Sequence, residues 1–217
     1  MGVDRNMRLT KIKLCGLSRE QDIEYVNEAL PDYAGFVFAE SRRQITADTA
    51  YRLKALLDKR ISSVGVFVNE DMAYIRNLCF EGVIDYVQLH GDEDNHYIQS
   101  LLELLSMSSC SKPIIKAVRV KDEQAVVLTA GLPVDYLLLD TYSESAYGGT
   151  GTTFDWKLAA SAQKPFFLAG GLNSQNVVSA IAAAQPYCVD ISSGVESNGV
   201  KDGSKIKNIV KLIRSVE

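Results

Sequence analysis

The sequence predicts a fold of the α/β class, a single (β/α)8 barrel over residues 1–217. Three observations carry this prediction. Eight short apolar runs alternate with amphipathic segments, successive runs begin about 20 to 30 residues apart, and polar or glycine residues follow the runs. Eight such units in 217 residues fit a barrel near the short end of its size range. The alternative is a doubly wound sheet, but no GxGxxG follows the first run and no run resembles an antiparallel edge strand.

The predicted strands are apolar runs too short for helices, typical of parallel strands covered on both faces. They are Leu9–Leu14, Ala34–Ala39, Ser63–Val68, Tyr86–His90, Ile114–Val120, Tyr136–Asp140, Phe166–Ala169 and Cys188–Ile191. The predicted helices are Arg19–Leu30, Ala47–Leu57, Met72–Phe80, Asn95–Leu105, Glu123–Leu128, Trp156–Ser161, Ser174–Ala184 and Ser204–Val216. Capping signals support three of them: Ser18 with Gln21, Asp71 before Met72, and Asn173 before Ser174.

Composition excludes several classes of function. The net charge is −4 and basic residues are dispersed, so we expect no nucleic-acid and no membrane partner. No apolar run approaches the ~18 residues of a membrane span, and the N-terminus lacks the apolar core of a signal peptide. The four cysteines show no CxxC spacing, which predicts a cytoplasmic protein without a metal site. The choice between a monomer and a homodimer stays open.

Polar and small residues collect where the predicted strands end. In a parallel barrel these positions meet at one mouth, which is where barrel enzymes place their chemistry. In chain order they are Cys15-Gly16, Glu40 to Arg43, Asn69-Glu70, His90 to Asp92, Arg119, Asp140-Thr141, Gly170-Gly171 and Ser192 to Gly194. We therefore expect the functional site at this end of the barrel.

The segment after the sixth strand is the richest of these. The run Tyr136–Asp140 ends on a carboxylate, and Gly148, Gly149 and Gly151 follow it. Glycines at this density suit a loop that flexes or brings backbone close to a ligand. A helix-capping or turn role for Asp140 is the alternative.

The last two strand ends predict a phosphate site. Residues 170–173 read GGLN and residues 192–195 read SSGV. Many barrels bind phosphate after strands seven and eight through backbone N–H groups, which side chains would hold away from the ligand. Turn glycines that merely end the strands are the alternative.

Cys15 and His90 also lie at strand ends. A lone cysteine is usually a small buried hydrophobe, but at a barrel mouth Cys15 could equally be a base or nucleophile. His90 could line the pocket or be a hydrogen-bonded loop residue. Of Arg42 and Arg43, one could bind a carboxylate through its guanidinium fork while the other is solvated.

Four polar residues fall inside the apolar strands: Lys13, Gln88, Lys116 and Asp190. Alternation along a strand places Lys13 on the face of Cys15. Because strand eight closes onto strand one, Lys13 and Asp190 are expected to be neighbours. We predict a polar layer inside the barrel below the site, with a mainly structural role.

Taken together, the motifs resemble the phosphoribosylanthranilate isomerase family, a barrel enzyme of tryptophan biosynthesis. The matching segments are Lys13–Leu17, Gly35–Phe38, Ser41–Arg43, Val64–Asn69, Val87–Gly91, Leu138–Thr141, Tyr147–Gly151, Phe154–Trp156, Gly170–Leu172 and Asp190–Glu196. They cover nearly the whole chain in order. Leu14 and Ser18 replace the usual isoleucine and threonine, and Thr152 stands where a lysine often follows the glycine loop.

The resemblance implies an Amadori rearrangement of N-(5-phosphoribosyl)anthranilate, a phosphosugar–anthranilate substrate, without a cofactor. It implies Asp140 as general acid and Cys15 as general base, with Arg43 on the anthranilate carboxylate. The residues expected to contact substrate are Arg43, His90, Gly149, Gly170, Gly171, Asp190, Ser192, Ser193 and Gly194. Two alternatives stay open: another phosphosugar enzyme, which would need a metal-ligand set or a catalytic lysine, and a catalytically silent ligand-binding barrel.

Overall fold

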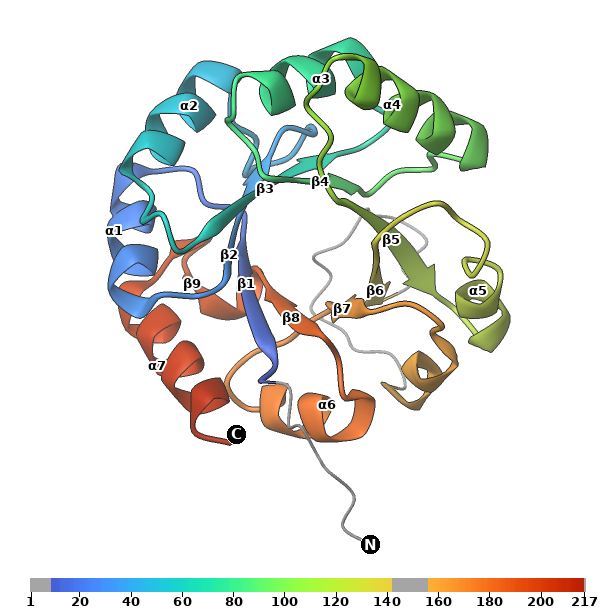
Figure 1. Ribbon diagram of the computed structural model, residues 1–217. Coiled ribbons are helices and arrows are strands. Elements are labelled where there is room, and N and C mark those ends of the chain that lie inside the picture. Colours follow the sequence, from blue (N-terminus) through green and yellow to red (C-terminus); the bar gives the residue numbers. More distant parts are fainter. Residues whose placement is uncertain (1–8, 142–155, 217) are drawn as a thin grey trace, which may run out of the picture.

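The computed structural model describes residues 9–141 and 156–216, and its strands confirm the predicted (β/α)8 barrel. Eight parallel strands pair in chain order, and β8 pairs back onto β1 to close the sheet. Helices surround the barrel on its outside (Figure 1). Among the described residues, no helix is long and apolar enough to cross a membrane. That residues 1–217 form one single domain stays a prediction.

The elements follow the predicted order closely. The barrel strands are β1 (Lys11–Cys15), β2 (Tyr33–Val37), β3 (Ser62–Phe67), β4 (Tyr86–Leu89), β5 (Ile114–Val120), β6 (Tyr136–Thr141), β7 (Phe166–Leu168) and β8 (Cys188–Ile191). The α-helices are α1 (Glu20–Ala29), α2 (Ala47–Leu56), α3 (Met72–Phe80), α4 (Asn95–Met107), α5 (Glu123–Val127), α6 (Val177–Ala184) and α7 (Gly203–Arg214). Two 3₁₀ turns, η1 (Trp156–Ser161) and η2 (Ser193–Val195), and a small hairpin of β9 (Glu196–Ser197) and β10 (Val200–Lys201) complete the described chain.

The helix predicted over Trp156–Ser161 is present and is a 3₁₀ helix. Two local predictions were wrong. Helix α6 begins at Val177 rather than at residue 174, because the Asn173 and Asn176 side chains accept backbone N–H groups and hold a turn there. At α1 the cap is Arg19, and the Asp22 carboxylate accepts its N–H group. The cap at Asp71 is confirmed, since its side chain accepts N–H groups of the first turn of α3.

The β9–β10 hairpin was not predicted, although its turn carries a clear signal. Asn198 and Gly199 have φ values of +51° and +81°, which an Asn-Gly pair adopts readily in a tight hairpin. The hairpin pairs Lys201 with Glu196 across its two short strands. This pairing places both side chains beside the mouth of the barrel, where they take part in the site described below.

Alternation along the strands decides which side chains face the barrel interior. The interior cluster includes Tyr33, Val64, Ile115 and Leu138. Because neighbouring residues point to opposite faces, Lys116 faces away from Ile115 and lies outside the barrel. Its ammonium donates to Glu93 Oε2 (2.9 Å) and to the Gly91 carbonyl (2.8 Å). Lys116 therefore does not belong to the predicted interior polar layer.

Aromatic rings fill the amino-terminal end of the barrel. Tyr33, Tyr86 and Tyr136 each begin a strand, and they pack with Phe167 and Tyr187 at centroid separations of 5.0–6.3 Å. The hydroxyls of Tyr33 and Tyr187 are 2.9 Å apart and hydrogen bonded. With this end filled, a ligand has to approach from the carboxyl ends of the strands.

Buried thiols make the stability of the fold sensitive to alkaline pH. All four cysteines are free, and burial raises the pKa of Cys15, of Cys188 and of Cys79, the last to about 12. An unfolded thiol ionises near pH ~8.5. Each group therefore stabilises the folded state fully below that pH, and the contribution is lost as pH rises toward the folded pKa.

We expect the free energy of unfolding of Cys79→Ala to fall less steeply above pH 9 than that of the parent. The difference in slope should approach ~1.4 kcal/mol per pH unit, the value for one proton released on unfolding. Urea unfolding at a series of pH values between 7 and 11 measures it. Tyrosine and lysine titration affects both proteins and cancels in the comparison. Parallel slopes would show that the Cys79 thiol ionises equally well in the folded protein.

Candidate active site

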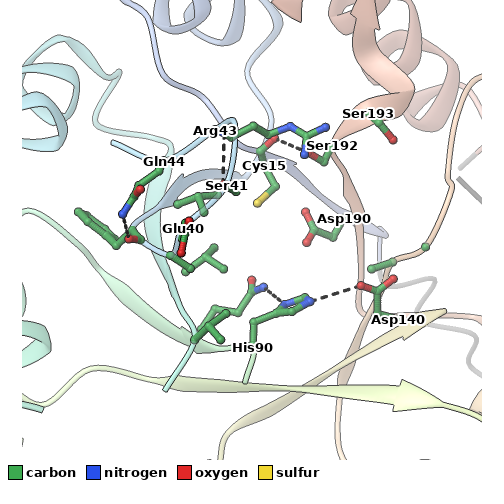
Figure 2. Close-up of a pocket in the computed structure, with 18 of the residues that line it drawn as sticks. Cys15, Glu40, Ser41, Arg43, Gln44, His90, Asp140, Asp190, Ser192 and Ser193 are labelled. Carbon is green, nitrogen blue, oxygen red and sulfur yellow. Dashed lines mark hydrogen bonds and ion pairs between the residues drawn. The ribbon is translucent and has the colours of Figure 1, made fainter. Parts of the chain in front are cut away.

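A cavity of about 530 Å³ opens at the carboxyl ends of the strands. Nine predicted site residues line it: Cys15, Arg43, His90, Asp140, Gly170, Gly171, Asp190, Ser192 and Ser193. Figure 2 shows the Cys15, Asp190 and Asp140 side chains pointing into this space. Gly194 does not line the cavity, and Gly149 lies outside the described residues.

Gly194 instead allows two loops to pack. A Cβ atom at this position would lie 2.0 Å from the carbonyl oxygen of Leu172. At this position the backbone after β8 therefore packs directly on the backbone after β7. Gly170 and Gly171 have φ values of +87° and +64°, which glycine adopts without strain. Together these glycines bring backbone close to the edge of the cavity.

Lys13 and Asp190 form the predicted polar layer. They are register partners on β1 and β8, and Lys13 Nζ lies 2.8 Å from Asp190 Oδ2. The Lys13 side chain is 0% exposed and that of Asp190 is 8% exposed. Although burial alone would lower it, the neighbouring carboxylate raises the pKa of Lys13 above its ordinary value. A permanent positive charge therefore lies directly below Cys15.

Cys15 is packed tightly at the top of β1. A Cβ atom on Gly35 would lie 2.8 Å from its Sγ atom, so a glycine there leaves space for the thiol. Burial raises the pKa of the Cys15 thiol, and the Asp190 carboxylate adds to this effect. The Lys13 and Lys201 ammonium groups act in the opposite direction. These two ammonium groups favour the thiolate, but burial of the thiol outweighs them.

His90 and Asp140 meet on the opposite side of the cavity. His90 Nε2 lies 3.4 Å from Asp140 Oδ2, and its other ring nitrogen, Nδ1, lies 2.9 Å from Gln88 Nε2. Asp140 is only 6% exposed. Figure 2 shows the His90–Asp140 pair across the cavity from Cys15.

Arg43 reaches the cavity, whereas Arg42 is directed to solvent. Their side chains are 17% and 60% exposed. Arg43 packs on Gly16, where a Cβ atom would lie 2.3 Å from the arginine Cδ atom and where φ is +80°. The place predicted for a carboxylate-binding arginine is therefore held by Arg43.

Glu196 fixes this arginine and was not predicted as a site residue. Its Oε1 accepts from Arg43 Nε (2.7 Å) and its Oε2 accepts from Arg43 Nη2 (3.0 Å). Lys201 Nζ also donates to Oε1 (2.9 Å), and Arg42 Nη2 donates to Oε2 (3.0 Å). Although burial alone would raise it, the Arg43 and Lys201 hydrogen bonds hold the pKa of Glu196 below its ordinary value. Three cations around one carboxylate leave this side of the mouth positively charged.

Ser192 links the loop after β8 to the end of β1. Its hydroxyl donates to the Cys15 carbonyl at 3.0 Å, while its own carbonyl accepts from Lys201 Nζ at 2.9 Å. Within residues 9–141 and 156–216, no group of three or more histidine, cysteine or acidic side chains is arranged to hold a metal ion. The chemistry that this part of the chain displays is that of a thiol, carboxyl groups, an imidazole and cations.

A closed parallel barrel with converging polar side chains at the carboxyl ends of its strands is a (β/α)8-barrel enzyme. Residues 12–212 match the protein family described as N-(5′-phosphoribosyl)anthranilate (PRA) isomerase. The chain belongs to this family. It is therefore an isomerase of tryptophan biosynthesis.

Individual relatives match the sequence or the fold of this chain over nearly its full length. An N-(5′-phosphoribosyl)anthranilate isomerase from Endomicrobium trichonymphae is 53% identical over 208 residues, which cover 96% of this chain and 100% of that protein. A structure of monomers generated from the dimeric phosphoribosylanthranilate isomerase of Thermotoga maritima is 33% identical, with a TM-score of 0.78 over 95% of this chain and 99% of that one. A phosphoribosylanthranilate isomerase in complex with reduced 1-(o-carboxyphenylamino)-1-deoxyribulose 5-phosphate is 32% identical, with a TM-score of 0.76 and the same coverage.

Proposed function

We propose that the chain converts N-(5-phosphoribosyl)anthranilate into 1-(2-carboxyphenylamino)-1-deoxyribulose 5-phosphate by general acid–base catalysis, with Asp140 as the acid and Cys15 as the base. The observation that carries this assignment is that the two side chains, from β6 and β1, line the same cavity. A carboxylic acid and a thiolate on separate walls can act on different atoms of one bound sugar. The acid and the base together can drive such a rearrangement by proton transfer to and from the substrate.

The acid step opens the sugar ring. Asp140 gives a proton to the ring oxygen, the bond between that oxygen and C1′ breaks, and the nitrogen lone pair forms a C=N bond. Protonated His90, or its neutral form with a proton on Nε2, can donate to the Asp140 carboxylate that results, since these atoms are 3.4 Å apart. His90 thereby stabilises the product side of this proton transfer.

The base step makes the enolamine. Cys15 thiolate takes the proton from C2′, the electron pair of that C–H bond forms C1′=C2′, and the C=N pair returns to nitrogen. The enolamine then tautomerises to the ketone. Because burial raises the pKa of Cys15, the thiol form dominates at pH 7, and Lys13 and Lys201 are the cations that favour the thiolate.

The two anionic ends of the substrate fit the charged and glycine-rich parts of the mouth. Arg43 is the group proposed for the anthranilate carboxylate, because Glu196 leaves its Nη1 edge available while it holds Nε and Nη2. The loops with Gly170, Gly171 and Ser193 are proposed for the phosphate, supported by their position after β7 and β8.

The relatives support the choice of ligand and leave two oligomeric states for the chain. The analogue bound to one relative carries a carboxyphenyl group and a sugar phosphate, as the proposed product does. A relative described as dimeric makes a homodimer the state to test first. Four free, buried cysteines suit the reducing cytoplasm, where we propose that the reaction takes place.

The decisive experiment follows the disappearance of phosphoribosylanthranilate fluorescence on addition of the purified protein. Turnover that depends on enzyme concentration supports the proposal. A protein that is folded by circular dichroism but leaves the fluorescence decay at its uncatalysed rate would refute it.

Arg43→Lys should lower kcat/KM by about tenfold or more. The variant keeps the charge, but a single ammonium group cannot both replace the two hydrogen bonds to Glu196 and present a separate donor edge to the ligand carboxylate. Arg42→Lys is the matched control: the neighbouring arginine contacts the same Glu196 but is 60% exposed, so its replacement should change kcat/KM less than threefold. An equal or larger loss at Arg42 would mean that the wrong arginine has been assigned to the carboxylate.

A further inference from the structure

Two buried oxygen atoms in the walls of the cavity lack a hydrogen-bond partner within the described part of the chain. They are Gln88 Oε1 and Asp190 Oδ1. Gln88 is 1% exposed and the Asp190 side chain is 8% exposed, and both residues line the cavity. Buried polar atoms in folded proteins are nearly always paired, so two such acceptors in one cavity point to a ligand that donates hydrogen bonds.

The Gln88 amide contacts His90 through its nitrogen, so its oxygen is not used in that contact. Gln88 Nε2 lies 2.9 Å from His90 Nδ1, and an amide nitrogen can only donate. Nδ1 must then be the acceptor, so the proton of a neutral His90 ring is on Nε2. That nitrogen lies 3.4 Å from Asp140 Oδ2. Gln88 thus sets the tautomer in which His90 donates toward Asp140.

The second acceptor lies across the barrel. Gln88 is on β4 and Asp190 is on β8, and three strands separate β4 from β8 in either direction around the closed sheet. Asp190 Oδ2 is already bound to Lys13, which leaves Oδ1. An acceptor therefore stands on each of two opposing walls. Phosphate and carboxylate groups are themselves acceptors, so these walls disfavour both anionic ends of a ligand.

We propose that Gln88 Oε1 and Asp190 Oδ1 accept hydrogen bonds from hydroxyl groups of the sugar, and that Gln88 is thereby a specificity-determining residue that also positions His90. The proposal rests on the function proposed above. The acceptors direct the sugar hydroxyls into the barrel, while the phosphate and the aromatic carboxylate stay at the rim with the glycine loops and Arg43. Gln88 belongs to the layer that the sequence predicts as mainly structural, and this role extends that prediction.

The hydroxyl contact is tested by pairing a variant with altered ligands. Gln88→Met keeps the approximate length of the side chain but removes both polar atoms. The probes are reduced 1-(o-carboxyphenylamino)-1-deoxyribulose 5-phosphate and counterparts lacking one sugar hydroxyl each. For at least one hydroxyl, the parent should lose about tenfold in affinity on its removal, whereas Gln88→Met should lose threefold or less. Titration calorimetry measures all of these constants.

Gln44→Met is the matched control, because Gln44 lines the same cavity but donates its amide to the Phe38 carbonyl at 2.9 Å. This variant should keep the tenfold dependence on the hydroxyl. If every deoxy analogue loses the same factor in the parent and in Gln88→Met, the contact with Gln88 is refuted. If the parent does not bind the complete analogue, the proposed function fails and the sugar contact fails with it.

The positioning role has a readout that a structural role would not change. The chain has two histidines, His90 and the exposed His96, so ¹⁵N spectra of labelled protein contain an internal reference. The parent should show His90 as the single tautomer protonated on Nε2. Gln88→Met should lose that preference while His96 is unchanged and thermal unfolding shows a folded protein. A parent His90 protonated on Nδ1, or spectra identical in parent and variant, would overturn the role.

Discussion

Asp140→Asn should reduce kcat by about 10²–10⁴-fold, the usual contribution of a general acid or base. The amide has nearly the shape of the carboxyl group and its oxygen can still accept from His90 Nε2, which is 3.4 Å from Asp140 in the parent. It has no proton of suitable acidity to give to the ring oxygen. Thermal unfolding should therefore be almost unchanged, and the loss should appear at saturating substrate.

Cys15→Ser should lose as much activity, and its pH profile separates the two roles. Because burial raises the pKa of Cys15 above its ordinary value, kcat/KM of the parent should still be rising above pH 9. The Asp140→Asn variant should retain that rise, since its base is intact. The Cys15→Ser variant should lose it, because a serine hydroxyl does not ionise in this range. Turnover near that of the parent in either variant, with the fold intact, would remove the residue from the mechanism and make His90 the next candidate.

The barrel could be predicted because its signal is local and repeated. Each strand is an apolar run bounded by turn residues, and period-two alternation assigns a side chain to one face without knowledge of its neighbours. Lys116 shows the limit of this reasoning. The same alternation that places Ile115 inside the barrel places Lys116 outside it, so the sequence already indicated that Lys116 is not part of the polar layer. The ion pair of Lys116 with Glu93 could not be predicted, because it depends on the conformation of the loop after β4.

The lining of the cavity was predictable where a residue lies at a strand end and less so where distant segments meet. The places of Cys15 and Asp140 in the cavity follow from their positions at the ends of β1 and β6, but Glu196 is 153 residues from the arginine that it holds. Glu196 and Lys201 reach the mouth because of a two-stranded hairpin with an Asn-Gly turn, a signal that the sequence contains. Gln88 was visible only as a polar residue in an apolar strand. Its contact with His90 and its open oxygen depend on side-chain conformations that no sequence pattern specifies.

Local charge cannot be predicted from residue types alone. A lysine two residues before a cysteine suggests a low thiol pKa, and Lys13 does act in that direction. Burial of Cys15 and the carboxylate of Asp190 act against it and prevail. The pKa of Cys15 depends in part on Lys13 and Asp190, the ion pair of the interior polar layer. The stability of this layer and the acidity of the thiol are therefore linked.

Asp190→Ala should lower the free energy of unfolding by about 3–5 kcal/mol, the usual result of removing one partner of a buried ion pair. Lys13 is 0% exposed and its ammonium lies 2.8 Å from the Asp190 carboxylate, so the variant leaves a buried charge without its counterion. The pKa of Lys13 is raised in the folded protein, so the stabilisation is complete below the unfolded pKa of ~10.4 and is lost only as pH rises toward the folded value. The loss should therefore be the same at pH 6 and at pH 8. Urea unfolding measures it.

Two further proteins show whether that loss comes from the unpaired charge. The double variant Lys13→Met with Asp190→Ala removes the charge as well as its partner, and it should be more stable than Asp190→Ala alone because replacing a buried pair by apolar groups costs less than breaking it. Glu28→Gln breaks the pair with Lys207, whose side chains are 58% and 56% exposed, and should change stability by less than about 1 kcal/mol. If the double variant is no more stable than Asp190→Ala, the loss reflects the cavity left by the aspartate. In that case the Lys13 ammonium of the Asp190→Ala variant would contact water or another carboxylate.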